Sequence, residues 1–313
     1  MVIEVQPLAR HERYAMVCRF LNADDHLDEG FAVPIRHGDR TTYPSAEELH
    51  RLITDGRRFQ DLLPTTFIRQ PVSAAATLDD RLEQLLRRTT WNEQELPVLS
   101  WQSSPEQHEG LLEDMYDRKN GVYAALDRPE ILRESGFNFE MLGDPPRIDD
   151  GALVKLEGRR AIRVEPNGTV TAAALGSSDM LGWASRPQGT IQRLNVIVLT
   201  EMTLEYYRLI DQHIMPRAPG PWRHRIQALR FQEPTTITLG TGGGNPQFPF
   251  HGEARQASAQ NWDRSWVAAE DPERDAYEAL VRIYALFGLP ACADPFIDGN
   301  RVSTEALLAS VGR

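Results

Sequence analysis

Cysteine is nearly absent from this sequence. The chain has 313 residues, and its two cysteines, Cys18 and Cys292, lie far apart along it. Two such residues can build neither a disulfide framework nor a zinc site of several thiolates. Long apolar runs are missing as well, because no stretch of about 18 consecutive apolar residues occurs. The start of the chain has no signal-peptide pattern, so we expect a cytoplasmic protein that does not span a membrane.

Basic residues are scarce relative to acidic ones. There are 34 Lys and Arg against 45 Asp and Glu, and the resulting net charge of −11 is spread along the chain. Affinity for nucleic-acid phosphates is mostly electrostatic, so this balance excludes a protein that binds nucleic acid with its whole surface. A local basic patch is still compatible with it. The length is typical of two or three domains.

Motifs of catalysis are missing too. The eight histidines form neither an HExxH nor an HxH pattern, and no Gly-x-Ser-x-Gly elbow occurs. The stretch Gly240–Gly244 lacks the Gly-Lys-Ser/Thr of a phosphate-binding loop and continues into Asn245-Pro246, which indicates a plain loop. The acidic pairs Asp24-Asp25 and Asp149-Asp150 are more typical of solvated turns than of a magnesium site. We therefore expect no catalytic residue, no cofactor and no metal ligand.

Alternating residues predict strands near the start of the chain. Apolar side chains recur at every second position around residues 1–6, 14–20 and 31–35, which is the period of a half-buried strand. Ser45-Ala46-Glu47-Glu48 is a capping box that opens a helix. Residues 1–63 are therefore expected to form a short strand-rich N-terminal lobe.

Three stretches of this lobe resemble a known family. Val2–Pro7 (VIEVQP), Phe31–Thr42 (FAVPIRHGDRTT) and Ser45–Leu49 (SAEEL) are similar to the closing part of the Schlafen/AlbA-type DNA-binding domain, over about 50 residues. That family ends in strands of the form V.V.PS and YvR.G..T and in a helix that opens s.eEi..L. Val33-Pro34-Ile35 replaces its usual aromatic-valine pair. The part of the family that holds the catalytic carboxylates of nuclease members has no counterpart here, so the resemblance implies a nucleic-acid surface without a nuclease site.

A linker rich in proline, alanine and threonine, residues 64–77, precedes a segment with helical patterns. Leucines recur at helical spacing directly after it, and a strand-like stretch covers residues 96–99. Ser104-Pro105 has the N-cap and N1 residues of another helix, and a shorter helix is expected over residues 129–135. Residues 77–142 are thus predicted to be helical. Their exposed residues are mainly acidic, which disfavours a helix that reads a DNA groove.

The longest apolar pattern runs from Ile191 to Ile214 and predicts one long central helix. Apolar side chains cover more than half of its circumference, as in a buried helix. Thr190 is the expected N-cap, and Pro216 cannot extend the helix. Its polar residues are expected to form one solvated strip: Glu201, Glu205, Arg208 and Asp211.

Strand patterns lie on both sides of this helix. Alternation between residues 154 and 170, with Asn167-Gly168 at a turn, predicts a three-stranded antiparallel meander. Further strands are expected around Ile226 and Ile237. A helix opens at Asp271-Pro272-Glu273, and Ser303 caps a last, short one.

Strands and helices in blocks, rather than in strict alternation, indicate the α+β class. We expect a short strand-rich N-terminal lobe (residues 1–63) and a helical middle segment (77–142). Residues 151–313 should form an α+β domain, a C-terminal antiparallel meander packed on the long central helix.

Two clusters are candidates for contact with nucleic acid. Arginine binds phosphate bidentately, and tryptophan can stack on a base. The alternatives are an exposed turn for the first cluster and, for the second, a strand whose arginines pair with carboxylates. The first basic cluster is Arg36, His37, Arg40 and Thr41, followed by Thr42. The second is Arg217, Trp222, Arg223 and Arg225, in a run that also contains His224 and Arg230.

The leading hypothesis is a non-catalytic regulatory or defence-associated protein that binds nucleic acid or another protein. The second hypothesis is a metal-dependent nuclease or hydrolase whose site is assembled from dispersed carboxylates and histidines. The third is a scaffold subunit in a homo- or hetero-oligomer, because a strand-rich lobe of about 60 residues leaves sheet edges that a partner can complete.

Overall fold

The computed structural model divides the chain into two units, Met1–Ala75 and Ala76–Arg313. In the first unit it describes the backbone of residues 2–4, 16–18, 35–37 and 40–42. In the second unit it describes residues 78–106, 111, 114–128, 132, 136, 139, 145–183, 191–233, 235–240, 255–290 and 294–310.

The described part of the first unit consists of two antiparallel strand pairs. These are β1 (Val2–Glu4) with β2 (Met16–Cys18), and β3 (Ile35–His37) with β4 (Arg40–Thr42). Strands near residues 1–6 and 14–20 were expected. A third strand was expected around residues 31–35; the described part of β3 begins at Ile35, residues 31–34 lie outside the described residues, and Arg40–Thr42 forms a strand beside it. The helix expected from Ser45 lies outside the described residues.

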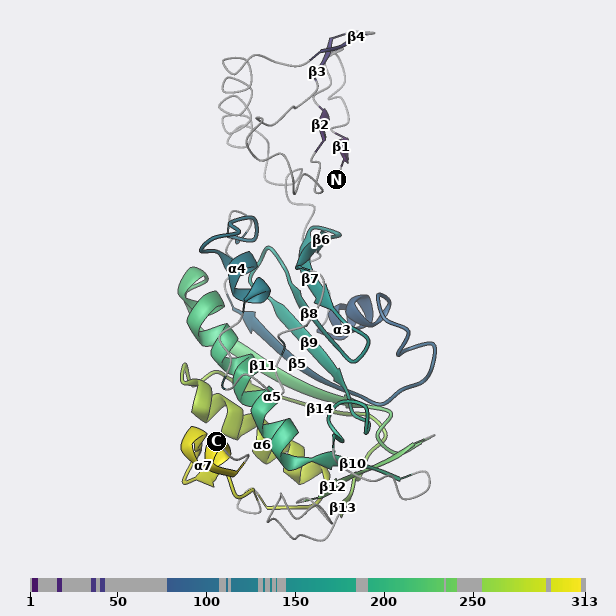
Figure 1. Ribbon diagram of the computed structural model, residues 1–313, viewed down its shortest axis with the longest axis vertical. Coiled ribbons are helices and arrows are strands. Elements are labelled where there is room, and N and C mark those ends of the chain that lie inside the picture. The colour runs from purple at the N-terminus through teal and green to yellow at the C-terminus, as the bar shows by residue number, and fades with distance from the viewer. Residues whose placement is uncertain are drawn as a thin grey trace. The chain divides into compact units, whose positions relative to one another are not determined.

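The second unit is built on a seven-stranded sheet in the order β14-β11-β5-β9-β8-β7-β6, antiparallel throughout (Figure 1). Its strands are β5 (Val98–Pro105), β6 (Arg147–Asp149), β7 (Ala152–Leu156), β8 (Arg160–Val164), β9 (Val170–Leu175), β11 (Trp222–Leu229) and β14 (Trp262–Val267). The mix of this sheet with helices confirms the α+β class.

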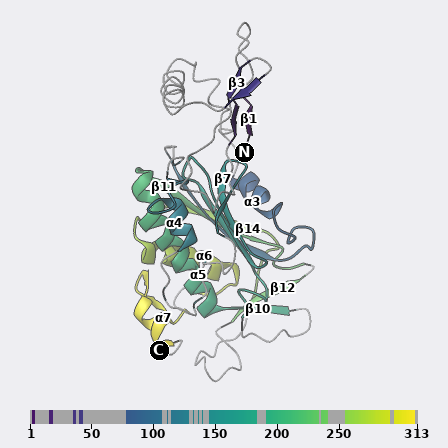
Figure 2. The same cartoon turned by 45° about the horizontal axis from the view of Figure 1, so that its top comes forward.

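Helices cover both faces of the sheet (Figures 1 and 2). One face carries α3 (Leu78–Leu86), and the other carries α4 (Val122–Asp127), α5 (Val196–Leu209) and α6 (Pro272–Leu286). A short parallel pair, β10 (Ile191–Asn195) with β12 (Thr236–Gly240), is extended by β13 (Arg255–Gln256). The chain continues through β15 (Ile297–Asp298) and β16 (Arg301–Val302) to α7 (Thr304–Ser310).

The predicted meander is confirmed as β7, β8 and β9. The turn between β8 and β9 is closed by Asn167, whose side-chain oxygen accepts from the Thr169 N–H at 3.0 Å. Gly168 has φ +87°, and a Cβ there would lie 3.1 Å from Pro105 Cγ. Both the backbone conformation and the close approach require glycine at this position.

The predicted helix over 191–214 is wrong at its beginning. Residues 191–195 form β10, and Asn195, not Thr190, is the N-cap: its side chain accepts from the Ile197 N–H at 2.9 Å. Parallel pairing with β12 fixes residues 191–195 as a strand, and that partner lies about 45 residues further along the chain. At the other end, Ile210–Ile214 is a π-helical turn and Met215–Arg217 a 3-10 turn that contains the expected proline stop.

The solvated strip predicted on this helix is also wrong for two of its members. Glu201 and Glu205 are buried, because α5 is sandwiched between the sheet and its neighbours. Glu205 accepts a hydrogen bond from the Leu132 N–H. The helix is thus more completely enclosed than its sequence indicated, and its carboxylates bond inside the protein.

The middle segment contributes a central strand as well as helices. The expected helix after the linker is confirmed as α3, with Leu82, Leu85 and Leu86 buried. Ser104-Pro105, however, ends β5 instead of opening a helix. Because β5 lies between β9 and β11, residues 98–105 and the C-terminal region share one sheet. Most of the helix expected over 129–135 lies outside the described residues.

The later helix signals are confirmed. Asp271 caps α6 by accepting from the Arg274 N–H at 3.2 Å, and Gly288, with φ +66°, follows its end. Ser303 caps α7 by accepting from the Ala306 N–H at 3.2 Å. These caps are local in sequence, so they could be recognised without knowledge of the tertiary fold.

Candidate functional site

Trp222 of the second basic cluster lies inside the core. Its side chain is 1% exposed, and its indole N–H donates to the Ala218 carbonyl at 2.9 Å. The expected role of stacking on a base would need this ring to leave the protein interior. The strand period explains the position, because Trp222 and His224 lie on the face of β11 that meets α5 and α6, whereas Arg223 and Arg225 lie on the other face.

Two arginines of this cluster are occupied within the protein. Arg225 is buried, and its fork meets the Asp263 carboxylate through Nε at 2.7 Å and through Nη2. Arg217 binds Asp114 Oδ1 at 2.9 Å and donates to two backbone carbonyls, those of His213 and Asn120, at 2.7 Å each. The alternative that these arginines pair with carboxylates therefore fits their contacts.

Arg223 is the member of the second cluster that faces solvent. Its side chain is 49% exposed and approaches Glu106 Oε1 at 3.4 Å, where the carboxylate is similarly exposed. An exposed ion pair of this kind contributes little to stability. One solvent-facing arginine with an acidic neighbour is a weak contact for phosphate, so the contacts of this cluster favour the alternative of a strand whose arginines pair with carboxylates.

The first basic cluster lies on the β3–β4 hairpin. Arg36 pairs with Thr41, and His37 pairs with Arg40, in adjacent positions of the antiparallel register. All four residues singled out in the sequence are therefore brought together by two short strands. Successive residues of a strand lie on alternate faces, so this register places Arg36 and Thr41 on one face of the strand pair and His37 and Arg40 on the other.

The structure also brings together a serine, a histidine and an aspartate that the sequence did not single out as a site. Ser103 Oγ of β5 lies 2.8 Å from His224 Nδ1 of β11, and His224 Nε2 lies 3.6 Å from Asp275 Oδ2 of α6. Tyr206 of α5 donates from its hydroxyl to Ser103 Oγ at 2.9 Å. A serine, a histidine and an aspartate in this sequence of contacts are the residue types of a catalytic triad, in which they act as nucleophile, base and carboxylate.

The geometry of this group nevertheless fits a structural network. Ser103 and His224 are completely buried, and Ser103 lies within β5, paired with strands on both sides. The Asp275 carboxylate accepts from the Ala269 N–H at 2.8 Å and 3.1 Å and is beyond hydrogen-bond distance of the imidazole. A nucleophile needs an open side on which the substrate can lie, and this serine has none.

Aromatic rings enclose the histidine. Tyr207 lies 4.8 Å and Trp266 5.7 Å from the His224 ring, centroid to centroid, both in edge-to-face arrangements. Burial raises the pKa of Tyr206 far above its usual value, so its hydroxyl stays protonated and donates to Ser103. We refer to Ser103, Tyr206, His224 and Asp275 as the buried polar network, which joins the sheet to α5 and α6.

No local pattern could have revealed this network. Ser103 and His224 are 121 residues apart, and they meet only because β5 and β11 are neighbours in the sheet. His224 belongs to a run of basic and aromatic residues, WRHR, that suggests a surface. The strand period predicts that His224 lies on the same face of β11 as Trp222, but it does not predict which residue His224 contacts.

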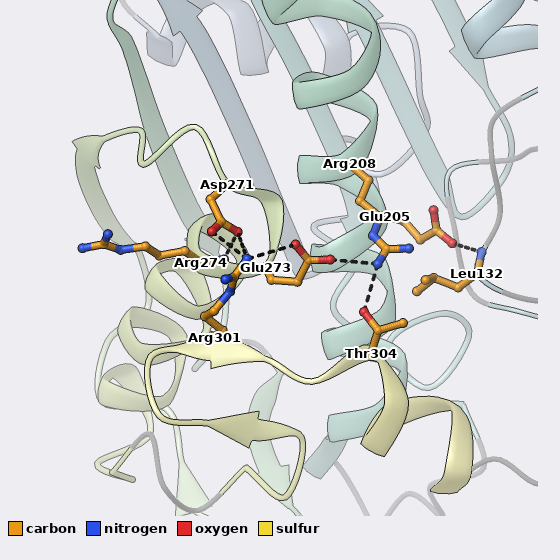
Figure 3. Close-up of polar contacts among 8 residues, drawn as sticks. All are labelled: Leu132, Glu205, Arg208, Asp271, Glu273, Arg274, Arg301 and Thr304. Carbon is orange, nitrogen blue, oxygen red and sulfur yellow. Dashed lines mark hydrogen bonds and ion pairs between the residues drawn. The ribbon is translucent and has the colours of Figure 1, made fainter.

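A second set of charged residues joins the three C-terminal helices (Figure 3). Arg208 of α5 contacts Glu273 Oε1 at 2.8 Å and donates to Thr304 Oγ1 at 2.9 Å. Arg301 lies 2.7 Å from Asp271 Oδ2 and 3.8 Å from Glu273 Oε2. These charges are satisfied within the protein, and their positions at the starts of α6 and α7 indicate that they hold those helices together.

The described ranges contain neither a cluster of metal-binding side chains nor a membrane-spanning helix. Within the described ranges, no three acidic, histidine or cysteine side chains gather closely enough to hold a metal ion. No helix in that part of the chain has the length and apolar character to cross a membrane. Comparisons with protein families, curated proteins and solved structures found no match to this chain.

Proposed function

We propose that the protein is a non-catalytic regulatory or defence-associated protein that binds nucleic acid through the first basic cluster. The supporting observation is the β3–β4 register, which gathers the four residues on two neighbouring strands and gives each face of the pair one arginine, Arg36 beside Thr41 and Arg40 beside His37. The resemblance of this segment to the closing part of the Schlafen/AlbA-type domain points to the same surface.

The contacts of the larger unit favour this division of roles. Arg217 and Arg225 bind carboxylates of the same unit, and Trp222 is in the core. Ser103 and His224, which have the chemistry of a nucleophile and a base, are enclosed by the sheet and α5. In this proposal the larger unit is a scaffold, and its charged groups hold its own elements together.

The test is a fluorescence polarisation titration of the full chain with short labelled single-stranded and double-stranded DNA. Measurements at about 50 mM and about 200 mM salt separate phosphate contacts from other binding, since the affinity for phosphates falls steeply with salt. The double variant Arg36→Ala/Arg40→Ala should weaken binding and lower the slope of log affinity against log salt by about 1–2.

Two controls locate the contact. Arg223→Ala removes the solvent-facing arginine of the second cluster and should leave the affinity unchanged. Thr41→Ala lies in the same hairpin but removes no charge, so it should leave the salt slope unchanged. If wild-type protein shows no binding at about 50 mM salt, where phosphate contacts are strongest, the nucleic-acid role is wrong and a protein-interaction role is the remaining hypothesis.

A further inference from the structure

Two buried arginines meet on the face of the sheet opposite α5. Arg81 comes from α3 and Arg163 from β8, and each is 5% exposed. Both approach one carboxylate, that of Glu165, which follows β8: Arg81 Nε lies 3.5 Å from Oε2, and Arg163 Nε lies 3.6 Å from Oε1. Two positive side chains thus share a single negative one.

One donor group of each of the two arginines makes no hydrogen bond within the described residues. The Nε atoms of Arg81 and Arg163 are buried and have no hydrogen-bond acceptor there, because the contacts with Glu165 are only charge contacts. Burial lowers the pKa of Arg81; the charge of Glu165 opposes this effect, and the charge of Arg163 adds to it. The two guanidinium groups therefore repel each other inside the protein, with one carboxylate between them.

Three other arginines of the same unit have closer carboxylate partners. Arg225, Arg217 and Arg208 each have a carboxylate oxygen within hydrogen-bond distance, at 2.7 Å, 2.9 Å and 2.8 Å. A buried charge without a matching partner is costly, and proteins normally compensate it. Arg81 and Arg163 thus lack the close carboxylate oxygen that these three arginines have, and a bound anion would supply an oxygen in its place.

We propose that Arg81 and Arg163 form a binding site for a small oxyanion, inorganic phosphate or the phosphate group of a small molecule, between α3 and β8. Guanidinium forks match the geometry of phosphate oxygens, and such charge-assisted bonds are among the stronger ones in proteins. Each side chain is only 7% exposed, so the ligand must be small. The site is separate from the first basic cluster and does not depend on the proposed function.

The position of the site implies a structural effect of binding. Arg81 belongs to a helix and Arg163 to the sheet beneath it, so an anion that binds both would hold α3 against β8. A ligand that binds the folded state alone stabilises it in proportion to the logarithm of its concentration. Phosphate should therefore raise the melting temperature of the protein in a saturable way.

The experiment titrates the full chain with inorganic phosphate at constant ionic strength, with chloride as the exchanged anion. Melting temperature is followed by scanning fluorimetry and affinity by calorimetry. We expect a saturable rise of several degrees with phosphate and none with chloride. Arg81→Gln and Arg163→Gln should each weaken phosphate affinity about tenfold or more, which is the loss of one charge-assisted contact.

Two further variants make the result specific. Glu165→Gln removes the competing negative charge and should strengthen phosphate binding, whereas a purely structural ion pair predicts only a loss of stability. Arg159→Gln changes an exposed arginine of the neighbouring turn and should bind phosphate as wild type does. The proposal is overturned if wild-type protein responds equally to phosphate and chloride. It is also overturned if Arg81→Gln and Arg163→Gln both retain wild-type affinity for phosphate. If only one of these variants folds, wild-type affinity of that variant overturns the proposal.

Discussion

Arg223 and His224 are neighbours in the sequence and have opposite environments. His224 points into the core and contacts Ser103, whereas Arg223 points to solvent. The same alternation separates Trp222 from Arg225. Function predicted from residue type alone placed all the arginines and the tryptophan on one surface, and the period of two along β11 is the physical reason why that grouping fails.

Removal of the buried imidazole should therefore be costly. His224→Ala is expected to lower the free energy of unfolding by about 2–4 kcal/mol, because it leaves a cavity and removes the hydrogen bond between Ser103 and the imidazole. The matched control Arg223→Ala should stay within about 0.5 kcal/mol of wild type. Urea denaturation measures both. Equal effects of the two variants would mean that the buried polar network does not stabilise the fold.

Arg225 should behave as a structural residue. Its fork and the Asp263 carboxylate form a bidentate pair, and its stem is buried. Arg225→Ala is expected to lower the free energy of unfolding by about 1–3 kcal/mol. The measurement is again urea denaturation. If the variant is as stable as wild type but binds DNA less tightly, Arg225 contacts nucleic acid and is not a structural residue.

Asp294 should make stability depend on pH. Burial raises its pKa from 3.8 to about 6, against hydrogen bonds from the Phe296 N–H and the Thr200 hydroxyl. Because the folded pKa is above the unfolded one, the stabilisation is complete below about pH 4 and is lost as pH rises to about 6. Asp294→Asn does not titrate, so its stability relative to wild type should increase across this window by up to about 3 kcal/mol.

The control for Asp294 is an exposed acid of the same segment. Asp298→Asn replaces an exposed acid and keeps Asp294, so the loss of stability between about pH 4 and pH 6 should remain as in wild type. Denaturation curves collected between about pH 4 and pH 7 compare the three proteins. Parallel profiles for all of them would mean that Asp294 titrates normally in the folded state.

Among the helices and strands, local signals were predictable and tertiary ones were not. The cap of α6, the cap of α7 and the turn at Asn167-Gly168 are each determined by a few consecutive residues. The beginning of α5 is different, since residues 191–195 form a strand only because β12 lies beside them. An apolar run of that length is compatible with helix or strand until its partner is known.

The N-cap of α5 offers a test of this boundary. Asn195 accepts from the Ile197 N–H and donates to the Trp183 carbonyl, both at 2.9 Å. Asn195→Ala should lower the free energy of unfolding by about 1–2 kcal/mol. Asn195→Asp keeps the acceptor and should lose less. If the alanine variant is as stable as wild type, the helix does not begin at this residue.

At the scale of the whole molecule, the α+β class could be predicted from the sequence, but the order of the strands in the sheet could not. A boundary was expected between residues 142 and 151, yet β5, from before that point, lies between β9 and β11. The order of strands in a sheet depends on contacts between residues far apart in the sequence, so it cannot be predicted from the periodicity of one segment. The same reason explains why the buried polar network and the Arg81–Arg163 pair were not predictable.

The shared sheet predicts how fragments behave. Residues 76–313 should unfold in a single cooperative transition, because they contain every strand of the seven-stranded sheet. Residues 151–313 lack β5 and should not fold, since β9 and β11 lose their common neighbour. Circular dichroism and thermal melting of the two fragments measure this. A cooperative transition in the shorter fragment would contradict the assignment of one unit.

Hydrogen–deuterium exchange of the full chain, with and without saturating DNA, tests the division between a nucleic-acid-binding hairpin and a self-contained scaffold. We predict slower exchange on binding in peptides that cover residues 35–42, with unchanged exchange in those that cover 222–229. Protection of residues 222–229 with no change at 35–42 would contradict the account, because the arginines of β11 would then be contacting the ligand.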